Sequence, residues 1–296
     1  MKQDILNRYL FEDYNLRGEL VQLQQSYQEI IDQQNYPAPV QTLLGEMLAA
    51  TCLLTATLKF EGDITVQLQG NGPLSVVAVS GTDQQQMRGI ARYQGAIDPN
   101  IDFAELVGQG HIVITITPTQ GERYQGIVEI NPQGVAASIE AYFQQSEQLN
   151  TKLWLYTGMF DGRPHASGLF LQALPASKDE DAEHFELIST LSETTTAQES
   201  FELDAEQLLF RLYHEHKVRL YEPQDVCFKC TCSKERCETA LANIDHKELL
   251  EICHEKGHIS MHCDYCGHDY KFNEADIENI FTRNISTNPA KISLSP

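Results

Sequence analysis

Seven of the eight cysteines of this 296-residue chain lie between residues 227 and 266, near its C-terminus. Cys52 stands alone, and the seven are Cys227, Cys230, Cys232, Cys237, Cys253, Cys263 and Cys266. Eight cysteines are too few for a disulfide-stapled scaffold, in which cysteine exceeds about 8% of a short chain. Their clustering favours metal binding or thiol redox chemistry. The C-terminal region is therefore expected to fold around these thiols.

Two close cysteine pairs, Cys230-x-Cys232 and Cys263-x-x-Cys266, flank a segment of thirty residues, 233–262. Four thiolates brought together in this way provide the tetrahedral sulfur coordination that Zn²⁺ prefers, with Zn–S bonds of about 2.3 Å. Gly267 directly follows the second pair and lets the chain turn tightly around an ion. The sequence therefore predicts one Zn²⁺ bound by these four cysteines.

The segment between the pairs predicts a small folded module. Asp245 and Glu248 match a helix-capping box, and Gly257 is placed to end the helix. Residues 258–263 then alternate as a strand. Cys253 lies on the apolar face of the predicted helix and is expected in the core of the module.

A competing motif, His254-Glu-Lys-Gly-His258, matches the H-E-x-x-H signature of zinc proteases. That chemistry needs both histidines on one face of a helix. Gly257 lies inside the motif, where a helix should end, and Met261 and Asp264 stand where an extended signature has Gly and His. The sequence therefore disfavours a metalloprotease.

Net charge limits the partners. The chain has 21 basic and 42 acidic residues, a formal net charge of −21, and this field repels phosphate backbones and anionic membranes. Residues 227–296 carry eight basic and eleven acidic residues, and four thiolates with one Zn²⁺ add about −2. We therefore expect no nucleic acid and no membrane as a partner, which disfavours a zinc ribbon that grips nucleic acid.

The compartment follows from the apolar segments. No secretory signal is visible in the charged first residues, and the most apolar stretch, residues 39–58, is interrupted by Gln41 and Glu46. We therefore expect a soluble, cytoplasmic protein whose thiols are kept reduced. Cys52 lies on the apolar face of this predicted helix and is expected to be a buried core residue.

Residues 1–177 have the pattern of an α+β domain. Residues 63–69 alternate strictly in hydrophobicity and run into a Gly-Asn-Gly-Pro turn, after which residues 74–79 complete a hairpin. A helix is predicted at 139–148, and further strands at 111–117, 124–130, 153–156 and 168–172. Because the strands come in runs, antiparallel sheets with helices packed on them are expected. This region has no phosphate-binding loop and no nucleophile elbow, so no enzyme active site is predicted in it.

Residues 178–226 differ in composition from both neighbours. Ten acidic residues and one basic residue lie between 178 and 206, a net charge of −9. Self-repulsion makes such a stretch marginal by itself. A helix begins at Asp204, which can cap it while Gln207 reaches back, and one face carries Leu208, Leu209, Leu212 and Tyr213. The segment is either a solvated linker or a linker that is folded only while its neighbour stays folded.

The Cys-x-Cys pair predicts redox chemistry in addition to metal binding. A disulfide between residues i and i+2 is cramped, and strained bridges are the labile, regulatory ones. Zn²⁺ holds its ligands as thiolates, the form that attacks oxidants. Structural zinc also supplies on the order of 10 kcal/mol of folding free energy. The hypothesis is a switch in which an oxidant expels zinc and exposes apolar surface.

Several motifs resemble those of the redox-regulated 33 kDa chaperonin family of bacteria, a family of zinc-thiolate holdases. The resemblance covers nearly the whole chain. Its motifs are FKCTCSKERC at 228–237, HCDYCG at 262–267, RGEL at 17–20, GDITVQLQG at 62–70, RGIAR at 88–92, GERYQG at 121–126 and SEQL at 146–149.

The resemblance implies an ATP-independent chaperone, not an enzyme, that acts under heat and oxidative stress. It implies that the reduced form binds one Zn²⁺ through Cys230, Cys232, Cys263 and Cys266 and is inactive. It further implies that oxidation yields Cys230–Cys232 and Cys263–Cys266 disulfides and releases zinc. The zinc module and the linker then unfold, the protein becomes a homodimer, and unfolding client proteins are held.

We therefore expect an α+β core over residues 1–177, a mainly helical metastable linker over 178–226 and a small zinc redox-switch domain over 227–296. Cys227 and Cys237 are expected to be spare thiols or core residues, and a Cys227–Cys230 bond can compete with the implied pairing. The alternative function is a thiol–disulfide oxidoreductase that uses Cys263-x-x-Cys266. Such enzymes place the attacking cysteine at the start of a helix.

Overall fold

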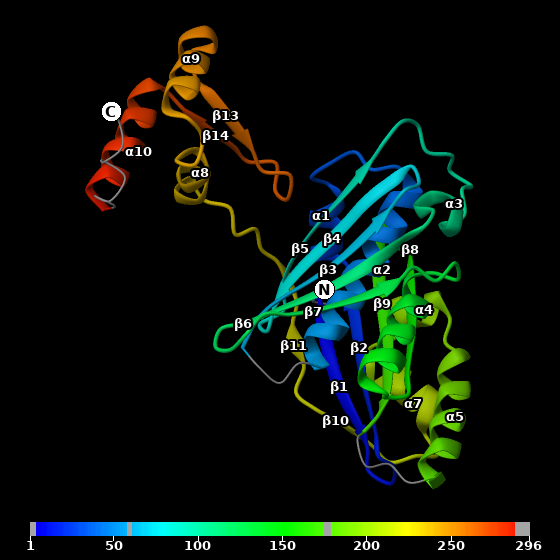
Figure 1. Cartoon of the computed structure of the whole chain (residues 1–296). Coiled ribbons are helices and arrows are strands. Elements are labelled where there is room, and N and C mark those ends of the chain that lie inside the picture. The colour runs from blue at the N-terminus through cyan, green and yellow to red at the C-terminus, as the bar shows by residue number, and fades with distance from the viewer. Residues whose placement is uncertain (1–3, 58–60, 175–178, 288–296) are drawn as a thin grey trace. The chain divides into compact units, whose positions relative to one another are not determined.

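The structure, a computed structural model, describes residues 4–57, 61–174 and 179–287. The chain divides into two compact units, Met1–Lys229 and Cys230–Pro296 (Figure 1). The first unit contains two sheets whose main strands are antiparallel, with helices packed on them. The α+β class and the antiparallel architecture expected from the sequence are therefore confirmed.

The first sheet has the strand order β10-β1-β2-β9-β8, with β11 paired to β1. All of its pairings are antiparallel. The sheet joins the start of the chain to strands from its middle and to the segment before Cys230. Its strands are β1 (Ile5–Phe11), β2 (Leu16–Leu23), β8 (Thr151–Phe160), β9 (Arg163–Ala173), β10 (Val218–Leu220) and β11 (Gln224–Asp225).

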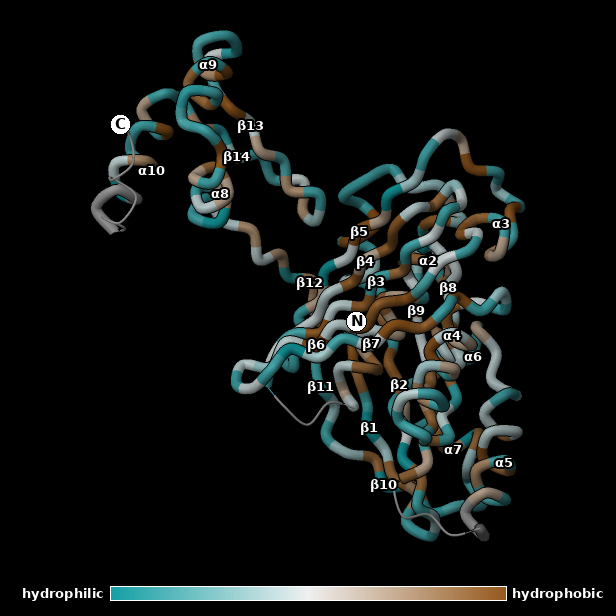
Figure 2. The backbone as a smooth tube through the Cα atoms, viewed as in Figure 1, coloured by the Kyte–Doolittle hydropathy of each residue, from teal (hydrophilic) through white to brown (hydrophobic). Residues whose placement is uncertain are grey.

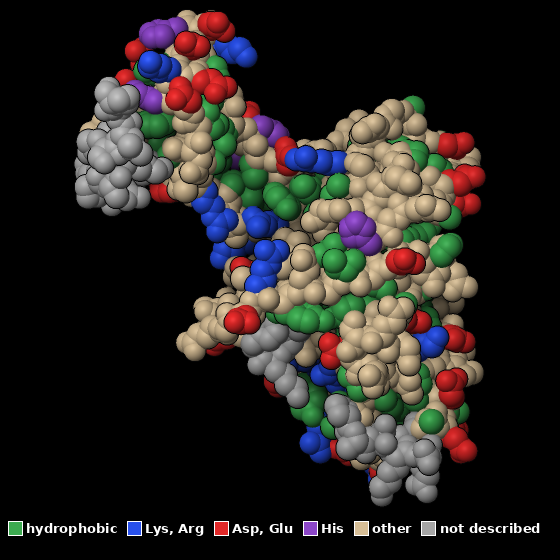
Figure 3. Space-filling model, viewed as in Figure 1, with side chains coloured by type: hydrophobic (Ala, Val, Ile, Leu, Met, Phe, Trp, Pro, Cys, Tyr) green, Lys and Arg blue, Asp and Glu red, His purple; other side chains and the backbone are tan. Residues whose placement is uncertain are grey.

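The second sheet has the order β12-β5-β4-β3-β6-β7. Only the pairing of β12 with β5 is parallel. The predicted alternation along β3 is confirmed, since Ile64, Val66 and Leu68 are buried and the residues between them are not. The strands are β3 (Gly62–Gly70), β4 (Leu74–Thr82), β5 (Gln86–Tyr93), β6 (Gly110–Pro118), β7 (Tyr124–Glu129) and β12 (Cys227–Phe228). Figure 3 shows hydrophobic side chains among polar ones on the face that carries β6 and β7.

Helix α2 (Ala38–Thr57) forms the centre of the main core, against both sheets. It is long and apolar enough to cross a membrane, but 72% of its most apolar 18-residue stretch is buried inside the unit, which is typical of a core helix. Cys52 on this helix is fully buried, as predicted. Figure 2 shows that hydrophobic residues predominate in this helix and in the strands around it. Shorter helices complete the layer: α1 (Gln25–Ile31), α3 (Phe103–Val107), α4 (Val135–Tyr142) and the π-helix η1 (Phe143–Glu147).

The opposite face of the first sheet is covered by α5 (Asp179–Glu193), α6 (Ala197–Glu202) and α7 (Ala205–Tyr213). The predicted cap of α7 is confirmed. Asp204 accepts a hydrogen bond from the backbone N–H of Gln207 at 2.9 Å, and the Gln207 side chain accepts one from the N–H of Asp204 at 3.2 Å. These helices and the sheet enclose a second hydrophobic cluster, which includes Tyr9, Phe11, Leu20, Phe185, Leu208 and Leu212.

The C-terminal unit contains three helices and one hairpin, β13–β14, in its described part. Its elements are α8 (Lys234–Leu241), α9 (His246–Lys256), β13 (Ile259–His262), β14 (Asp269–Phe272) and α10 (Glu274–Thr287). Its core is small, because the buried cluster consists of Leu241, Leu249, Cys253, Phe272, Ile277 and Ile280. Most residues of this unit are hydrophilic (Figure 2). Apolar burial alone is therefore a weak source of stability for it.

Candidate metal centre

Two short segments of the C-terminal unit carry the four motif cysteines. Cys230 and Cys232 lie between β12 and the start of α8, and Cys263 and Cys266 lie in the turn between β13 and β14. The turn is closed by a hydrogen bond from the backbone N–H of Gly267 to the carbonyl of Cys263 at 2.8 Å. Gly267 has a φ of +67°, a value that favours glycine. The glycine after the second pair thus allows the tight turn predicted from the sequence.

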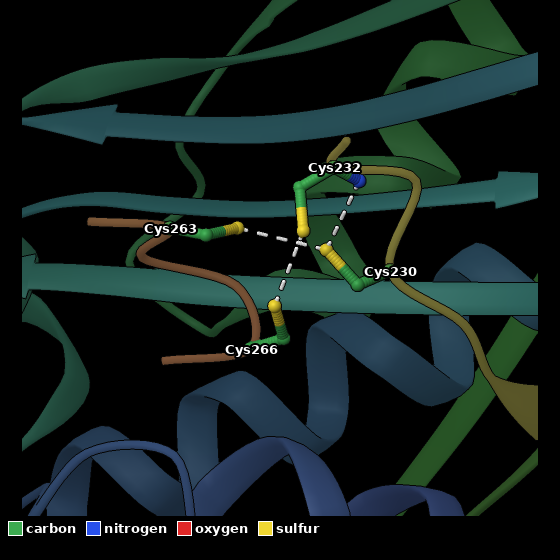
Figure 4. A group of neighbouring side chains, drawn as sticks. All are labelled: Cys230, Cys232, Cys263 and Cys266. Atoms are coloured by element: carbon green, nitrogen blue, oxygen red, sulfur yellow. Dashed lines mark hydrogen bonds between the residues drawn. The ribbon is translucent and has the colours of Figure 1, made fainter. Parts of the chain in front are cut away.

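The four sulfur atoms point toward one another (Figure 4) and all lie within 4.8 Å of one another. The Sγ atoms of Cys230 and Cys263 are 3.6 Å apart, and those of Cys232 and Cys266 are 3.4 Å apart. Four Zn–S bonds of about 2.3 Å in a tetrahedron give sulfur–sulfur edges of about 3.8 Å. The observed distances are close to that edge and well beyond the length of a disulfide bond. Four half-buried thiols at this spacing can hold one metal ion.

The electrostatics of the cluster favour a cation. Burial raises the pKa of Cys230 and of Cys266, because a thiolate loses solvation there. Burial also acts on Cys232, but the hydrogen bond from Tyr270 and those with the other thiols outweigh it and lower its pKa to about 7. The Tyr270 hydroxyl donates to the Sγ of Cys232 at 3.2 Å. Four thiolates so close together repel one another, and a divalent cation compensates that repulsion.

The remaining cysteines lie elsewhere. Cys253 is buried in the core of the unit, where its Sγ lies 3.9 Å from the carbonyl oxygen of Phe272, so its predicted core role is confirmed. Cys237 is half-buried and packs against the same core from α8. Cys227 is exposed and belongs to β12. Among the described residues, none of these three joins the cluster of four.

The H-E-x-x-H motif does not form a protease site. Helix α9 ends at Lys256, and Gly257 adopts a left-handed conformation with a φ of +80°. His258 therefore lies beyond the helix, and the two histidines do not share a helical face. His254 is 3.8 Å from a carboxylate oxygen of Glu274 instead. The predicted end of the helix at Gly257 is thus confirmed.

The context of Cys263-x-x-Cys266 also differs from that of a thiol–disulfide oxidoreductase. Both cysteines lie in a β-hairpin turn, so no helix begins at either of them. The macrodipole of a helix N-terminus, which lowers the pKa of an attacking cysteine, is absent from this turn. Two further cysteines lie within contact distance of the pair. This arrangement is typical of a metal site.

Comparisons with known proteins find relatives over nearly the whole chain. A family model described as "Hsp33 protein" matches residues 4–273. The 33 kDa chaperonin of Aeromonas salmonicida is 52% identical over 281 residues, which cover 95% of this chain and 96% of that protein. The 33 kDa chaperonin of Pectobacterium atrosepticum is 54% identical over 280 residues, with the same coverage of both chains. A crystal structure of a 33 kDa chaperonin from Thermotoga maritima shares the fold, with a TM-score of 0.84 at 21% identity, and covers 96% of this chain and 100% of its own.

Proposed function

The chain belongs to the Hsp33 family, and on that premise we propose that it is a redox-regulated holdase, a chaperone that binds unfolding proteins without ATP and prevents their aggregation. The names of its relatives support a chaperone, not an enzyme. In this proposal the protein acts in the cytoplasm, under heat and oxidative stress. The reduced, zinc-bound form is inactive, and oxidation activates it.

The observation that carries the proposal is the cluster of four cysteines in a unit with a small core. We assign one Zn²⁺ to Cys230, Cys232, Cys263 and Cys266, because zinc favours four thiolates in a tetrahedron. Structural zinc supplies about 10–16 kcal/mol of folding free energy, whereas a domain of this size rarely gains more than about 3–5 kcal/mol from its core. Loss of the ion therefore removes more folding free energy than the core of the unit supplies, and we expect the unit to unfold.

Oxidation of the cluster proceeds in two steps for each disulfide. A thiolate attacks a peroxide oxygen to give a sulfenic acid, and a second thiol condenses with it, with loss of water. Each disulfide thus consumes one peroxide, which takes up the two electrons. We propose the pairs Cys230–Cys232 and Cys263–Cys266 from the resemblance to the family. The short sulfur–sulfur contacts of the reduced cluster, Cys230–Cys263 at 3.6 Å and Cys232–Cys266 at 3.4 Å, join the two motifs, so the proposed pairs rest on the resemblance and not on proximity.

The linker connects the switch to the chaperone core. Helices α5 to α7 cover apolar residues of β1 and β2, among them Tyr9, Phe11 and Leu20. Between α7 and Cys230 the chain pairs with the sheets through β10, β11 and β12, which are two or three residues long, and Val226 is buried in the main core. We propose that unfolding of the zinc unit spreads through these short strands and releases the helices. The apolar residues beneath them then become a surface for unfolding client proteins, and the oxidised chains form homodimers.

The net negative charge of the chain supports unfolded proteins as its partners. A net charge of −21 opposes binding to nucleic acid and to anionic membranes. A hydrophobic surface revealed only after oxidation suits an unfolding chain of any sequence. We therefore propose unfolded proteins as the partners.

The experiment measures three signals on the full chain, reduced and zinc-loaded, before and after treatment with peroxide at elevated temperature. They are zinc release, light scattering by a heat-denatured client protein, and the fluorescence of Trp154. Trp154 is the single tryptophan, and it packs against the second cluster beneath the linker helices. We expect zinc release, suppressed aggregation and a red shift of the tryptophan emission to appear together.

A pair of neighbouring cysteines provides the control. Cys230→Ser removes a proposed ligand, whereas Cys227→Ser removes an exposed thiol three positions away. We expect the first variant to be purified with far less zinc and the second with the normal amount. If reduced, zinc-replete protein protects the client as well as oxidised protein does, the proposed switch is wrong.

A further inference from the structure

A cavity of about 480 Å³ lies in the first unit, far along the chain from the cysteine cluster. Residues of both sheets, of the end of α2 and of the α4–η1 segment line it. Its volume is in the range of pockets that bind small organic molecules, about 300–1,000 Å³. Most of its lining is apolar: Leu54, Ile64, Ile114, Ile116, Pro118, Phe143, Leu149 and Leu174.

Among the described lining residues, one cationic side chain, Arg17 of β2, interrupts the apolar surface. Its Nη2 donates a hydrogen bond to the Oε1 of Gln172 at 2.7 Å. The Gln172 amide in turn donates to the hydroxyl of Thr151 at 2.9 Å, and that hydroxyl donates to the carbonyl of Leu149 at 3.2 Å. Gln172 is 2% exposed and Thr151 is 8% exposed, so the chain of hydrogen bonds is buried. The guanidinium is thus held in one place at the polar end of the cavity.

The charge of Arg17 is incompletely compensated. Its Nε is buried and has no acceptor. Glu19, two residues along the same face of β2, is 2% exposed and has an unpartnered Oε2. Burial, only partly opposed by Arg17 and Arg8, raises the pKa of Glu19 to about 7, so this carboxyl is only partly ionised near neutral pH. A half-buried cation with an unpaired N–H donor favours an anion that can reach it.

Only one acidic residue, Glu147, belongs to the described lining of the cavity, and its side chain is exposed. Solvent therefore screens its charge. The apolar side chains of the walls offer no charged partner to a bound anion. The guanidinium of Arg17 is the one fixed positive charge among the lining residues that the structure describes.

We propose that this cavity binds an aliphatic group that ends in a carboxylate, with the carboxylate against Arg17 and the aliphatic part against the isoleucine and leucine side chains. A guanidinium binds a carboxylate through parallel N–H donors, which gives both strength and orientation. A free fatty acid and the C-terminus of an apolar peptide share this chemistry. The proposal does not depend on zinc or on the redox switch.

Calorimetric titration of the reduced, zinc-loaded full chain tests the proposal with two pairs of probes. Octanoate is compared with 1-octanol, and N-acetyl-leucyl-leucine is compared with its C-terminal amide. We expect saturable binding at one site for octanoate or for the peptide acid, and at least tenfold weaker binding for its uncharged counterpart. The member that binds more tightly identifies the source of the carboxylate. If neither acid binds, or if the uncharged probes bind equally well, the proposal is wrong.

Variants locate the binding site. Arg17→Gln removes the charge, and Ile116→Trp fills the cavity from β6. Thr115→Trp is the matched control, because the neighbouring residue of β6 points to the opposite face of the sheet. We expect the first two substitutions to weaken binding at least tenfold and the control to leave it unchanged, with zinc content and unfolding temperature checked for each. Unchanged binding by folded Ile116→Trp protein would overturn the assignment.

Discussion

The linker helices provide the most direct test of how the proposed switch is coupled to the chaperone core. Leu208 of α7 is fully buried in the cluster that these helices form with β1, β2 and β9. Replacing a fully buried leucine by alanine costs about 3 kcal/mol, within a range of roughly 2–5 kcal/mol. In the proposed switch the helices leave the sheet without unfolding of the whole unit, so that cost falls on their docking.

The magnitude follows from the equilibrium between docked and released helices. A loss of about 3 kcal/mol raises the released population about 100-fold, since each 1.4 kcal/mol is a factor of about ten. We therefore expect reduced, zinc-loaded Leu208→Ala protein to suppress aggregation of a heat-denatured client without oxidant. Its Trp154 emission should shift to the red at a lower temperature or urea concentration than in the wild type.

Phe210 on the same helix is the matched control, because its side chain is 72% exposed. Phe210→Ala should change stability by no more than about 0.5 kcal/mol and should leave the reduced protein inactive. If Leu208→Ala protein is destabilised but inactive until oxidised, release of these helices does not expose the client surface. If both variants become active, a general loss of stability and not this interface is responsible.

Three further predictions concern individual side chains. Burial raises the pKa of Glu19 from its ordinary value of 4.5 to about 7, so the free energy of unfolding falls by up to about 3 kcal/mol as the pH rises from about 4.5 to about 7. Burial raises the pKa of Glu46 to about 7 as well, so Glu19→Gln should reduce the fall without abolishing it, in urea unfolding followed by Trp154 fluorescence. An equally steep fall in the variant would contradict the reasoning. Gly257→Ala should destabilise the C-terminal unit by about 1 kcal/mol, because φ is +80° there. No neighbour lies within 4 Å of the added Cβ, so the cost is backbone strain alone. Faster amide exchange in α9 measures this cost, and unchanged exchange would refute the strain. Asp204→Ala should destabilise α7 by about 1 kcal/mol, because the helix loses its N-cap. A lower melting temperature in circular dichroism would reveal this loss, and an unchanged melting temperature would exclude it.

Local patterns in the sequence sufficed to predict the cluster of four cysteines. Two cysteine pairs and a glycine after the second pair specify a tight turn that presents thiols, and the structure places all four sulfurs together. The helix boundary at Gly257 and the cap at Asp204 are likewise set by nearby residues. Asp245 caps α9 as predicted, although among the described hydrogen bonds no return bond comes from the Glu248 side chain. Each of these features depends on interactions within a few residues of the chain.

Features that depend on distant pairing could not be predicted in the same way. Strand β2 carries two charged residues, Arg17 and Glu19, on the face that packs toward the core, and they interrupt the alternation by which strands are recognised. Their burial becomes intelligible only once β9 supplies Gln172 beside Arg17. The predicted helix 139–148 differs from the structure in its bounds and type. The structure begins it earlier, as α4 (Val135–Tyr142), and continues it as the π-helix η1 (Phe143–Glu147).

The proposed release of the linker depends on the balance between its charges and its buried apolar face. Its negative charges would favour detachment, and its described local supports are small: two capping boxes and an ion pair between Arg211 and Glu199 at 2.8 Å. What holds α7 in place is therefore mainly its apolar face, with Leu208 and Leu212 buried against the sheet. A helix held mainly by its buried apolar side chains gains little stability from its surface charges. For this reason a change confined to the buried carbons of Leu208 is expected to shift the docking equilibrium, whereas a change at exposed Phe210 is not.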